Sequence, residues 1–170
     1  MLGLASFLIL LGNFCLHLCI PFVPAFVIAK KVRADKQHDY SDDCVHPFDE
    51  RRRGTVFGEA AAAILLDPET DTDIAVTGAA TNNNAFHMTA PAKRADGTRR
   101  VLAEAMADAS VAPEEIDFVS AHATGTLAND RTESEALTDL FGAPPPPVLG
   151  LKSSLGHLLG AAGLAELIIA

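Results

Sequence analysis

The sequence predicts an α/β domain in which helices pack against a layered sheet. Short apolar runs alternate with segments of helical periodicity from residue 73 to the C-terminus, in the order β-α-β-α-β-α. Hydrophobic residues make up 49% of the 170 positions and charged residues 21%, which is enough apolar material for the core of one domain. The formal net charge of −9 argues against a nucleic-acid partner, because phosphates repel an acidic surface.

An apolar segment and a polar linker occupy residues 1–45, ahead of the predicted domain at residues 46–170. Met1–Ile20 is long enough to span a bilayer as a helix, since about 20 apolar residues suffice. The basic residues that follow would face the cytoplasm by the positive-inside rule: Lys30, Lys31, Arg33 and Lys36. The alternatives are a buried core segment of a larger fold and a chain start that is not the natural one. We therefore expect a cytoplasmic protein, or one that is membrane-associated through Met1–Ile20.

Cys15 and Cys19 lie four residues apart in this apolar segment, so they would share one face of a helix. No second pair of metal ligands accompanies them, and we predict no metal site. Both are interpreted as small buried hydrophobes.

The first predicted elements of the domain are two strands and a helix. Residues 59–66 are small and then aliphatic, which predicts a buried strand that Asp67-Pro68 closes. A second apolar run spans residues 73–80. A helix is predicted over residues 98–109, where four apolar side chains repeat at helical spacing: Val101, Leu102, Ala105 and Met106.

The next strand and helix surround a histidine. A short buried strand over residues 116–121 leads directly to His122. A helix is predicted over residues 129–141, because Asn129 and Asp130 suit its cap and first turn.

A second histidine follows the last predicted strand. Gly142 ends the preceding helix, and residues 148–152 are predicted to form a strand. His157 comes soon after it, at the start of a segment rich in glycine and alanine that is predicted to be helical up to residue 170.

His122 and His157 are the candidate catalytic pair. A histidine after a strand is more often a packed core residue, but both of these lie among small residues at strand-to-helix junctions. Two neutral imidazoles can donate from Nε2 to a thioester oxygen, where negative charge develops as an enolate forms in a decarboxylative condensation. Lys152 is the third candidate, because its charge can order or polarise the pocket; an exposed lysine at the strand end is the simpler alternative.

Small and hydroxyl-bearing residues surround the two histidines. Gly125 and Gly156 allow the backbone to approach a ligand closely. Thr124 and Thr126 offer hydroxyl groups to a polar substrate arm.

Asp130 and Glu133 lie three residues apart and therefore share one face of the predicted helix. A solvated helix N-terminus explains these acids as well as a functional role does. Glu133 is also a candidate to pair with Lys152.

Residues 47–170 resemble the β-ketoacyl synthase family. The motifs that carry the resemblance are Pro47-Phe48-Asp49, Gly58-Glu59, Ala85-Phe86-His87-Met88-Thr89-Ala90-Pro91, Ala121-His122-Ala123-Thr124-Gly125-Thr126 and Lys152-Ser153-Ser154-Leu155-Gly156-His157. The last two motifs, in this order and about this far apart, are the most specific. The resemblance implies an incomplete thiolase-like α/β fold. It also implies the condensation of an acyl thioester with malonyl on acyl carrier protein, in fatty acid or polyketide biosynthesis.

The resemblance further implies roles for the candidate residues. His122 and His157 would hold the malonyl thioester carbonyl, and Lys152 would order the site. Thr124 and Thr126 would meet the phosphopantetheine arm, which carries the substrates, so no separate cofactor is implied. The implied partners are acyl carrier protein and a ketosynthase subunit, in a homodimer or a heterodimer.

The chain also departs from the family pattern. The family nucleophile is a cysteine at the N-terminus of a buried helix, and no cysteine in this chain stands in such a context; Cys44 falls just before the Pro-Phe-Asp motif, too late to be that residue. Ala123 stands where the family usually has glycine and would be strained at a positive φ. We predict that the chain alone does not complete the condensation. The alternative is a non-catalytic, chain-length-factor-like or docking subunit, membrane-tethered if Met1–Ile20 spans a bilayer.

Overall fold

The computed structural model describes residues 6–11, 14–19, 26–31, 44–64, 75–83 and 95–170. The strands within them are β1 (Ser6–Leu11), β2 (Phe14–Cys19), β3 (Phe26–Lys31), β4 (Gly58–Ala63), β5 (Ala75–Thr81), β6 (Phe118–Ser120) and β7 (Val148–Leu149). The helices are α1 (Asp96–Ala109), α2 (Leu127–Phe141), α3 (Lys152–Leu155) and α4 (Ala162–Ile169), with 3-10 turns η1 (Pro113–Glu115) and η2 (Leu159–Ala161).

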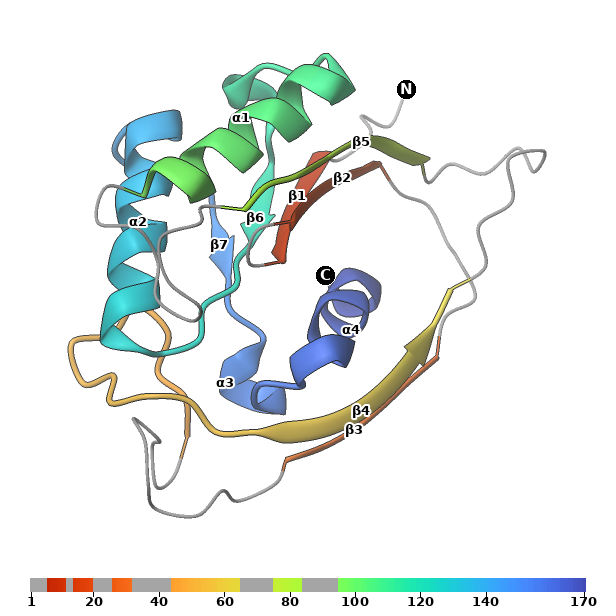
Figure 1. Ribbon diagram of the computed structural model, residues 1–170, viewed down its shortest axis with the longest axis vertical. Coiled ribbons are helices and arrows are strands. Elements are labelled where there is room, and N and C mark those ends of the chain that lie inside the picture. Colours follow the sequence, from red (N-terminus) through yellow and green to blue (C-terminus); the bar gives the residue numbers. More distant parts are fainter. Residues whose placement is uncertain (1–5, 12–13, 20–25, 32–43, 65–74, 84–94) are drawn as a thin grey trace.

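The strands form two sheets (Figure 1). The larger has the order β5-β2-β1-β6-β7, with β1 parallel to β6 and antiparallel to β2. β3 and β4 form a separate antiparallel ribbon. α1 packs against β2, β5 and α2, whereas α4 lies between the larger sheet and the ribbon, in contact with β1, β3 and β4. The layered α/β architecture predicted from the sequence is therefore confirmed.

The main hydrophobic core lies between α1, α2 and the sheet. The four residues of α1 predicted to face the core are all buried: Val101, Leu102, Ala105 and Met106. They pack with Ile116 just before β6, with Val119 of β6 and with Leu137 of α2. Burial of each large apolar side chain contributes about 1.5–3 kcal/mol, so this cluster fixes the position of β6 and of the residues that follow it.

The described residues of the N-terminal apolar segment form strands rather than the bilayer-spanning helix considered for Met1–Ile20. β1 and β2 pair antiparallel from Ser6↔Cys19 to Leu11↔Phe14, and β1 also pairs with β6. A strand within a sheet can be continuously apolar in sequence, as a spanning helix is. No helix among the described residues is long and apolar enough to cross a membrane. The alternative of a core segment fits this position, and Cys15 and Cys19 lie on a strand rather than on a helix.

Two predicted strands differ from the observed ones. The buried strand predicted over residues 59–66 is β4, in which Glu59, Ala61 and Ala63 are exposed, because only one face of β4 packs on α4. The strand predicted over residues 148–152 is limited to β7, and Lys152 begins α3.

The cap of α2 lies three residues before the predicted one. The Thr126 hydroxyl accepts a hydrogen bond from the Asn129 backbone N at 3.3 Å, so Thr126 is the N-cap. Asn129 and Asp130 belong to the first turn, and Gly142 ends the helix as predicted.

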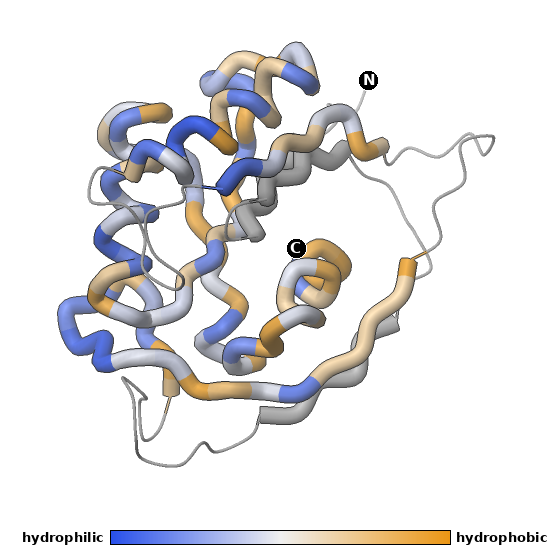
Figure 2. The backbone as a smooth tube through the Cα atoms, viewed as in Figure 1, coloured by the Kyte–Doolittle hydropathy of each residue, from blue (hydrophilic) through white to orange (hydrophobic). Residues whose placement is uncertain are grey.

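Hydropathy follows these layers (Figure 2). α4, which lies between the sheet and the ribbon, is largely hydrophobic, and the loop that precedes β4 is hydrophilic. The predicted boundary between residues 45 and 46 stays a prediction. The pairs β1–β6 and β3–β4 join strands from the two sides of that boundary.

Candidate active site

The backbone at His122 is held by a buried carboxylate. His122 follows β6 by two residues, and its N–H donates to Glu133 Oε1 at 2.6 Å. The Ala123 N–H donates to Glu133 Oε2 at 2.8 Å. Glu133 is only 2% exposed. Its position on α2 therefore orients the loop that carries His122, and the predicted pairing of Glu133 with Lys152 is wrong, because both carboxylate oxygens are directed at this loop.

Ala123 adopts the positive φ that the sequence predicted would strain it. Its φ is 43°, in the left-handed region that disfavours a β-carbon. The hydrogen bonds from the N–H groups of His122 and Ala123 to the Glu133 carboxylate on α2 hold this conformation.

The backbone at His157 is anchored to the segment that leads into β4. The His157 N–H donates to Val56 O at 2.7 Å, and the Gly58 N–H donates to His157 O at 3.0 Å. Gly156 has φ 74° and ψ 178°, a conformation that is essentially restricted to glycine. A β-carbon at Gly156 would lie 2.9 Å from Val56 O, so the approach of β4 to His157 requires glycine there.

The substitution Gly156→Ala is expected to lower the free energy of unfolding by about 1–3 kcal/mol, because alanine is strained at this φ and ψ. The matched control is Gly160→Ala, where nothing lies within 4 Å of the added β-carbon. We expect the control to change the stability by less than about 0.5 kcal/mol. Equal stability of the two variants in urea unfolding would contradict the strain at Gly156.

The two imidazole rings face one another. Their centroids are 5.4 Å apart and the rings meet edge to face at 87°. Burial lowers the pKa of His122 to about 3 and that of His157 to about 4, and the positive charge of Lys152 adds to both effects. Both rings are therefore neutral at physiological pH.

The tautomer of His157 follows from one hydrogen bond. The Leu159 N–H donates to Nδ1 of His157 at 3.2 Å, so Nδ1 is an acceptor. In a neutral ring the proton is then on Nε2. His157 therefore presents an N–H donor from Nε2, the donor that binding of a thioester oxygen requires.

Lys152 forms a buried ion pair with Glu166. Its Nζ lies 2.7 Å from Glu166 Oε1, and the two side chains are 0% and 3% exposed. The alternative of an exposed strand-end lysine is wrong. Glu166 was missed in the sequence, although a single acid within the apolar run Gly-Leu-Ala-Glu-Leu-Ile-Ile signals a buried partner. The pair joins α3 to α4 and keeps the Lys152 charge beside the two histidines.

The predicted substrate-arm residues belong to the turn between β6 and α2. Thr124 Oγ1 and Thr126 Oγ1 are 3.0 Å apart. Asp130 fixes this turn by accepting from the N–H of Gly125 at 3.0 Å and from that of Phe48 at 2.8 Å. Each threonine hydroxyl has one donor and two lone pairs, so capacity for a ligand remains.

The pH dependence of stability is expected to reflect Glu133. Burial raises the pKa of Glu133 from its usual 4.5 to about 7, against the opposing effect of its backbone hydrogen bonds. The folded state then binds this proton more tightly than the unfolded state does. The contribution of this proton to the free energy of unfolding is fully present below pH 4.5 and is lost as the pH rises through 7. Its size is about 3 kcal/mol, at about 1.4 kcal/mol per pKa unit.

The side-chain amide in the Glu133→Gln variant cannot titrate, so the variant lacks this contribution. We expect the free energy of unfolding of the wild type to fall relative to that of Glu133→Gln as the pH rises from 5 to 8. Urea unfolding at each pH measures the difference, in which the other titrating groups cancel. A difference that stays constant over this range would contradict the raised pKa.

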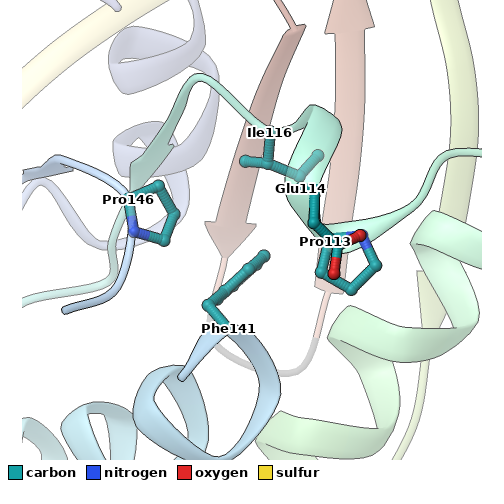
Figure 3. A pocket seen from close by; sticks show the side chains of 5 residues that line it. All are labelled: Pro113, Glu114, Ile116, Phe141 and Pro146. Carbon is teal, nitrogen blue, oxygen red and sulfur yellow. The ribbon is translucent and has the colours of Figure 1, made fainter. Parts of the chain in front are cut away.

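A pocket of about 200 Å³ lies elsewhere on the molecule (Figure 3). It is lined by residues of η1 and the residue after it, the end of α2 and the proline-rich connection: Pro113, Glu114, Ile116, Phe141 and Pro146. None of these is a predicted site residue. No group of three or more His, Cys, Asp or Glu side chains suited to a metal ion occurs in the described part of the chain.

Two neutral imidazoles beside a buried lysine, on a layered α/β scaffold, are typical of carbon–carbon condensing enzymes with the thiolase-like fold. The profile of the beta-ketoacyl synthase C-terminal domain matches residues 74–170, more than half of the chain. The chain therefore belongs to the β-ketoacyl synthase family.

Individual relatives agree with this assignment. The chain is 34% identical over 154 residues to 3-oxoacyl-(acyl-carrier-protein) synthase 2 of Mycobacterium bovis, covering 86% of this chain and 37% of that protein. It is 37% identical to the ishigamide ketosynthase/chain length factor, with a TM-score of 0.63 over 76% of this chain and 33% of that one. A ketosynthase solved with a type II acyl-carrier protein and bound to the hexaketide gives 26% identity and a TM-score of 0.63, over 74% and 33%. The chain thus spans about a third of the length of its relatives, and the predicted thiolase-like fold class is confirmed.

Proposed function

We propose that the chain provides the part of a β-ketoacyl-acyl carrier protein synthase that binds and decarboxylates the malonyl unit. The observation that carries the proposal is the pair of neutral, edge-to-face imidazoles of His122 and His157. A thioester oxygen that accepts from both rings would receive two preorganised N–H donors in a partly buried site.

The proposed reaction begins with cleavage of the bond between the malonyl carboxylate and the α-carbon. Carbon dioxide leaves, and the electron pair moves into the enolate, whose negative charge is concentrated on the thioester oxygen. Donors directed at this oxygen bind the enolate more strongly than the neutral thioester, which lowers the barrier. Protonation of the enolate gives an acetyl thioester, whereas attack on an acyl group gives the β-ketoacyl product.

Lys152 supports this step electrostatically. Its positive charge disfavours protonation of both histidines. The same charge stabilises negative charge that develops nearby. Because Glu166 holds Nζ within hydrogen-bond distance, Lys152 acts as a positioning residue rather than as a proton donor to the substrate.

We also propose acyl carrier protein as the partner that delivers the malonyl group. Thr124 and Thr126 are suited to bind the amide groups of a phosphopantetheine arm, because their hydroxyls lie together in the turn after His122. The arm would carry the substrate, so the chain would need no separate cofactor. The acyl-accepting nucleophile would come from another part of a synthase, in a homodimer or a heterodimer with a ketosynthase subunit.

The test is release of labelled carbon dioxide from malonyl carrier protein that carries the label in its free carboxylate. We expect the chain to release carbon dioxide and to form acetyl carrier protein. Absence of carbon dioxide release from the folded chain would overturn the proposal. Formation of β-ketoacyl product when carrier protein loaded with an acyl group is also added to the chain alone would contradict the prediction that the nucleophile lies elsewhere.

A non-catalytic, chain-length-factor-like subunit is the second candidate function, because a structural relative includes such a factor. This function requires the chain to bind a complete homologous synthase. Co-elution of the two proteins in size-exclusion chromatography, without carbon dioxide release by the chain, would favour it.

A further inference from the structure

A buried hydroxyl group without a protein partner lies in the segment that leads into β4. Thr55 is 8% exposed, and its Oγ1 forms no hydrogen bond within the part of the chain that the structure describes. Most buried side-chain hydroxyls in native proteins are hydrogen-bonded, because an unpaired one destabilises the fold. A ligand that supplies the missing partner would explain this exception.

The backbone on both sides of Thr55 is bonded to the two loops that carry the histidines. The Gly54 N–H donates to Gly125 O at 3.0 Å, in the turn after the first histidine. The Val56 carbonyl accepts from the His157 N–H at 2.7 Å. Thr55 is therefore held between the two loops whose imidazoles form the proposed pair of donors.

The Thr55 side chain lies on the face of this segment that the His157 ring occupies. Phe57 and His157 form a parallel β-bridge, so their side chains lie on the same face, with the ring centroids 6.3 Å apart. Thr55 and Phe57 both form β-bridges and are two residues apart, which places their side chains on one face as well. Rotation about the Thr55 Cα–Cβ bond among its staggered positions can turn the hydroxyl toward a ligand beside the imidazoles.

A malonyl thioester has a second polar end that needs a donor. The two imidazoles would bind its thioester oxygen, and Lys152 is engaged by Glu166 at 2.7 Å. A cation held directly against the malonyl carboxylate would stabilise the charge that decarboxylation removes, and would raise the barrier. A neutral hydroxyl binds the carboxylate less strongly, so it can orient this group and still let it leave as carbon dioxide.

We propose that the Thr55 hydroxyl donates a hydrogen bond to the malonyl carboxylate and makes the site selective for thioesters that carry one. This inference rests on the proposed function, because it assigns a contact to the same ligand. Loss of one hydrogen bond to a charged group predicts an affinity for the malonyl group that is about 10- to 100-fold lower. An acetyl group has no carboxylate, so its affinity should not depend on this hydroxyl.

The test uses the full chain and two stable ligands, the malonyl and acetyl amides of N-acetylethylenediamine, in which nitrogen replaces the thioester sulfur. Titration followed by the imidazole proton resonances in NMR measures the Kd of each. Thr55→Val keeps the shape of the side chain without the hydroxyl, and should weaken binding of the malonyl amide about 10- to 100-fold. Its affinity for the acetyl amide should stay within about twofold of that of the wild type. Thr55→Ser keeps the hydroxyl and should keep most of the preference for the malonyl amide.

The matched control is Thr138→Val, the same change at an exposed position of α2, which should leave both affinities unchanged. Equal affinity of the wild type and Thr55→Val for the malonyl amide would overturn the proposal. Equal weakening of both ligands would also overturn it, because that result indicates a packing role. Thr55→Val should not lower the midpoint of urea unfolding, since it removes an unpaired hydroxyl. A lower midpoint would show that the hydroxyl has a structural partner, and would overturn the proposal as well.

The binding readout is separate from carbon dioxide release. A wild type that binds the malonyl amide through Thr55 but releases no carbon dioxide from malonyl carrier protein would overturn the proposed decarboxylation alone. A wild type that releases carbon dioxide, with equal affinities in Thr55→Val, would overturn the role of Thr55 alone.

Discussion

Replacement of His157 or His122 by alanine is expected to lower the rate of carbon dioxide release from malonyl carrier protein about 10²–10³-fold. Each variant removes one preorganised donor to the oxygen on which charge develops, and losses of this size are typical for such a donor. For His157 the donor is identified, because Leu159 donates to Nδ1 and leaves the proton on Nε2. The measurement is single-turnover release of label, with circular dichroism to show that each variant is folded.

A conservative variant distinguishes the effect of the N–H donor from that of the imidazole ring. His157→Gln keeps an N–H donor of similar reach, so it should recover part of the rate that His157→Ala loses. Arg53→Gln, on an exposed part of the loop before β4, should keep the wild-type rate. An alanine variant that folds and keeps the wild-type rate would show that its ring does not contact the reacting oxygen.

The parts of the fold that depend on local periodicity could be predicted from the sequence. α1 was predicted within two residues of its observed start, because four buried apolar residues repeat at the helical period. Gly142 ends α2 as predicted, with its φ of 84° in a region that favours glycine. His122 lies as predicted at a junction between a strand, β6, and a helix, whereas His157 follows the short helix α3 rather than a strand.

The parts that depend on tertiary contacts could not be predicted in this way. Glu133 follows His122 by 11 residues, and only the packing of α2 beside β6 brings its carboxylate to the backbone N–H groups of His122 and Ala123. Continuous apolar sequence does not distinguish a central strand from a membrane helix, which is why β1 and β2 were missed. The position of Thr55 between the two histidine loops depends on backbone hydrogen bonds, for which hydropathy provides no signal.

The buried pair of Lys152 and Glu166 is the clearest case, because its partner was chosen wrongly. The sequence suggests Glu133, 19 residues before Lys152, as a candidate partner, whereas the actual partner is Glu166, 14 residues after it. In the fold, α3 and α4 are separated only by η2 and bring Glu166 to Nζ, whereas Glu133 is engaged by backbone donors. The site therefore depends on two separate carboxylates, one that orients the His122 loop and one that neutralises Lys152.

Lys152→Met is expected to lower the free energy of unfolding by about 3–5 kcal/mol, because it leaves the buried Glu166 carboxylate without a compensating charge. Burial already raises the pKa of Glu166, and Lys152 opposes that rise. Without the lysine the pKa of Glu166 rises further, so the variant loses more stability as the pH increases from 5 to 8. Urea unfolding followed by far-UV circular dichroism measures this, since the chain has no tryptophan and only one tyrosine.

The double variant Lys152→Met/Glu166→Met should recover most of the loss, because a buried pair replaced by apolar side chains of similar volume is often neutral. Arg100→Met breaks an exposed ion pair of the same length, 2.7 Å to Glu104, and should lower the free energy of unfolding far less than Lys152→Met does. A Lys152→Met variant as stable as Arg100→Met would contradict the buried pair. The single variant should also raise the pKa of His122 and of His157, because Lys152 lowers both, and imidazole proton resonances in NMR would follow this change. Loss of stability without those rises would mean that Lys152 holds α3 to α4 but does not act on the two histidines.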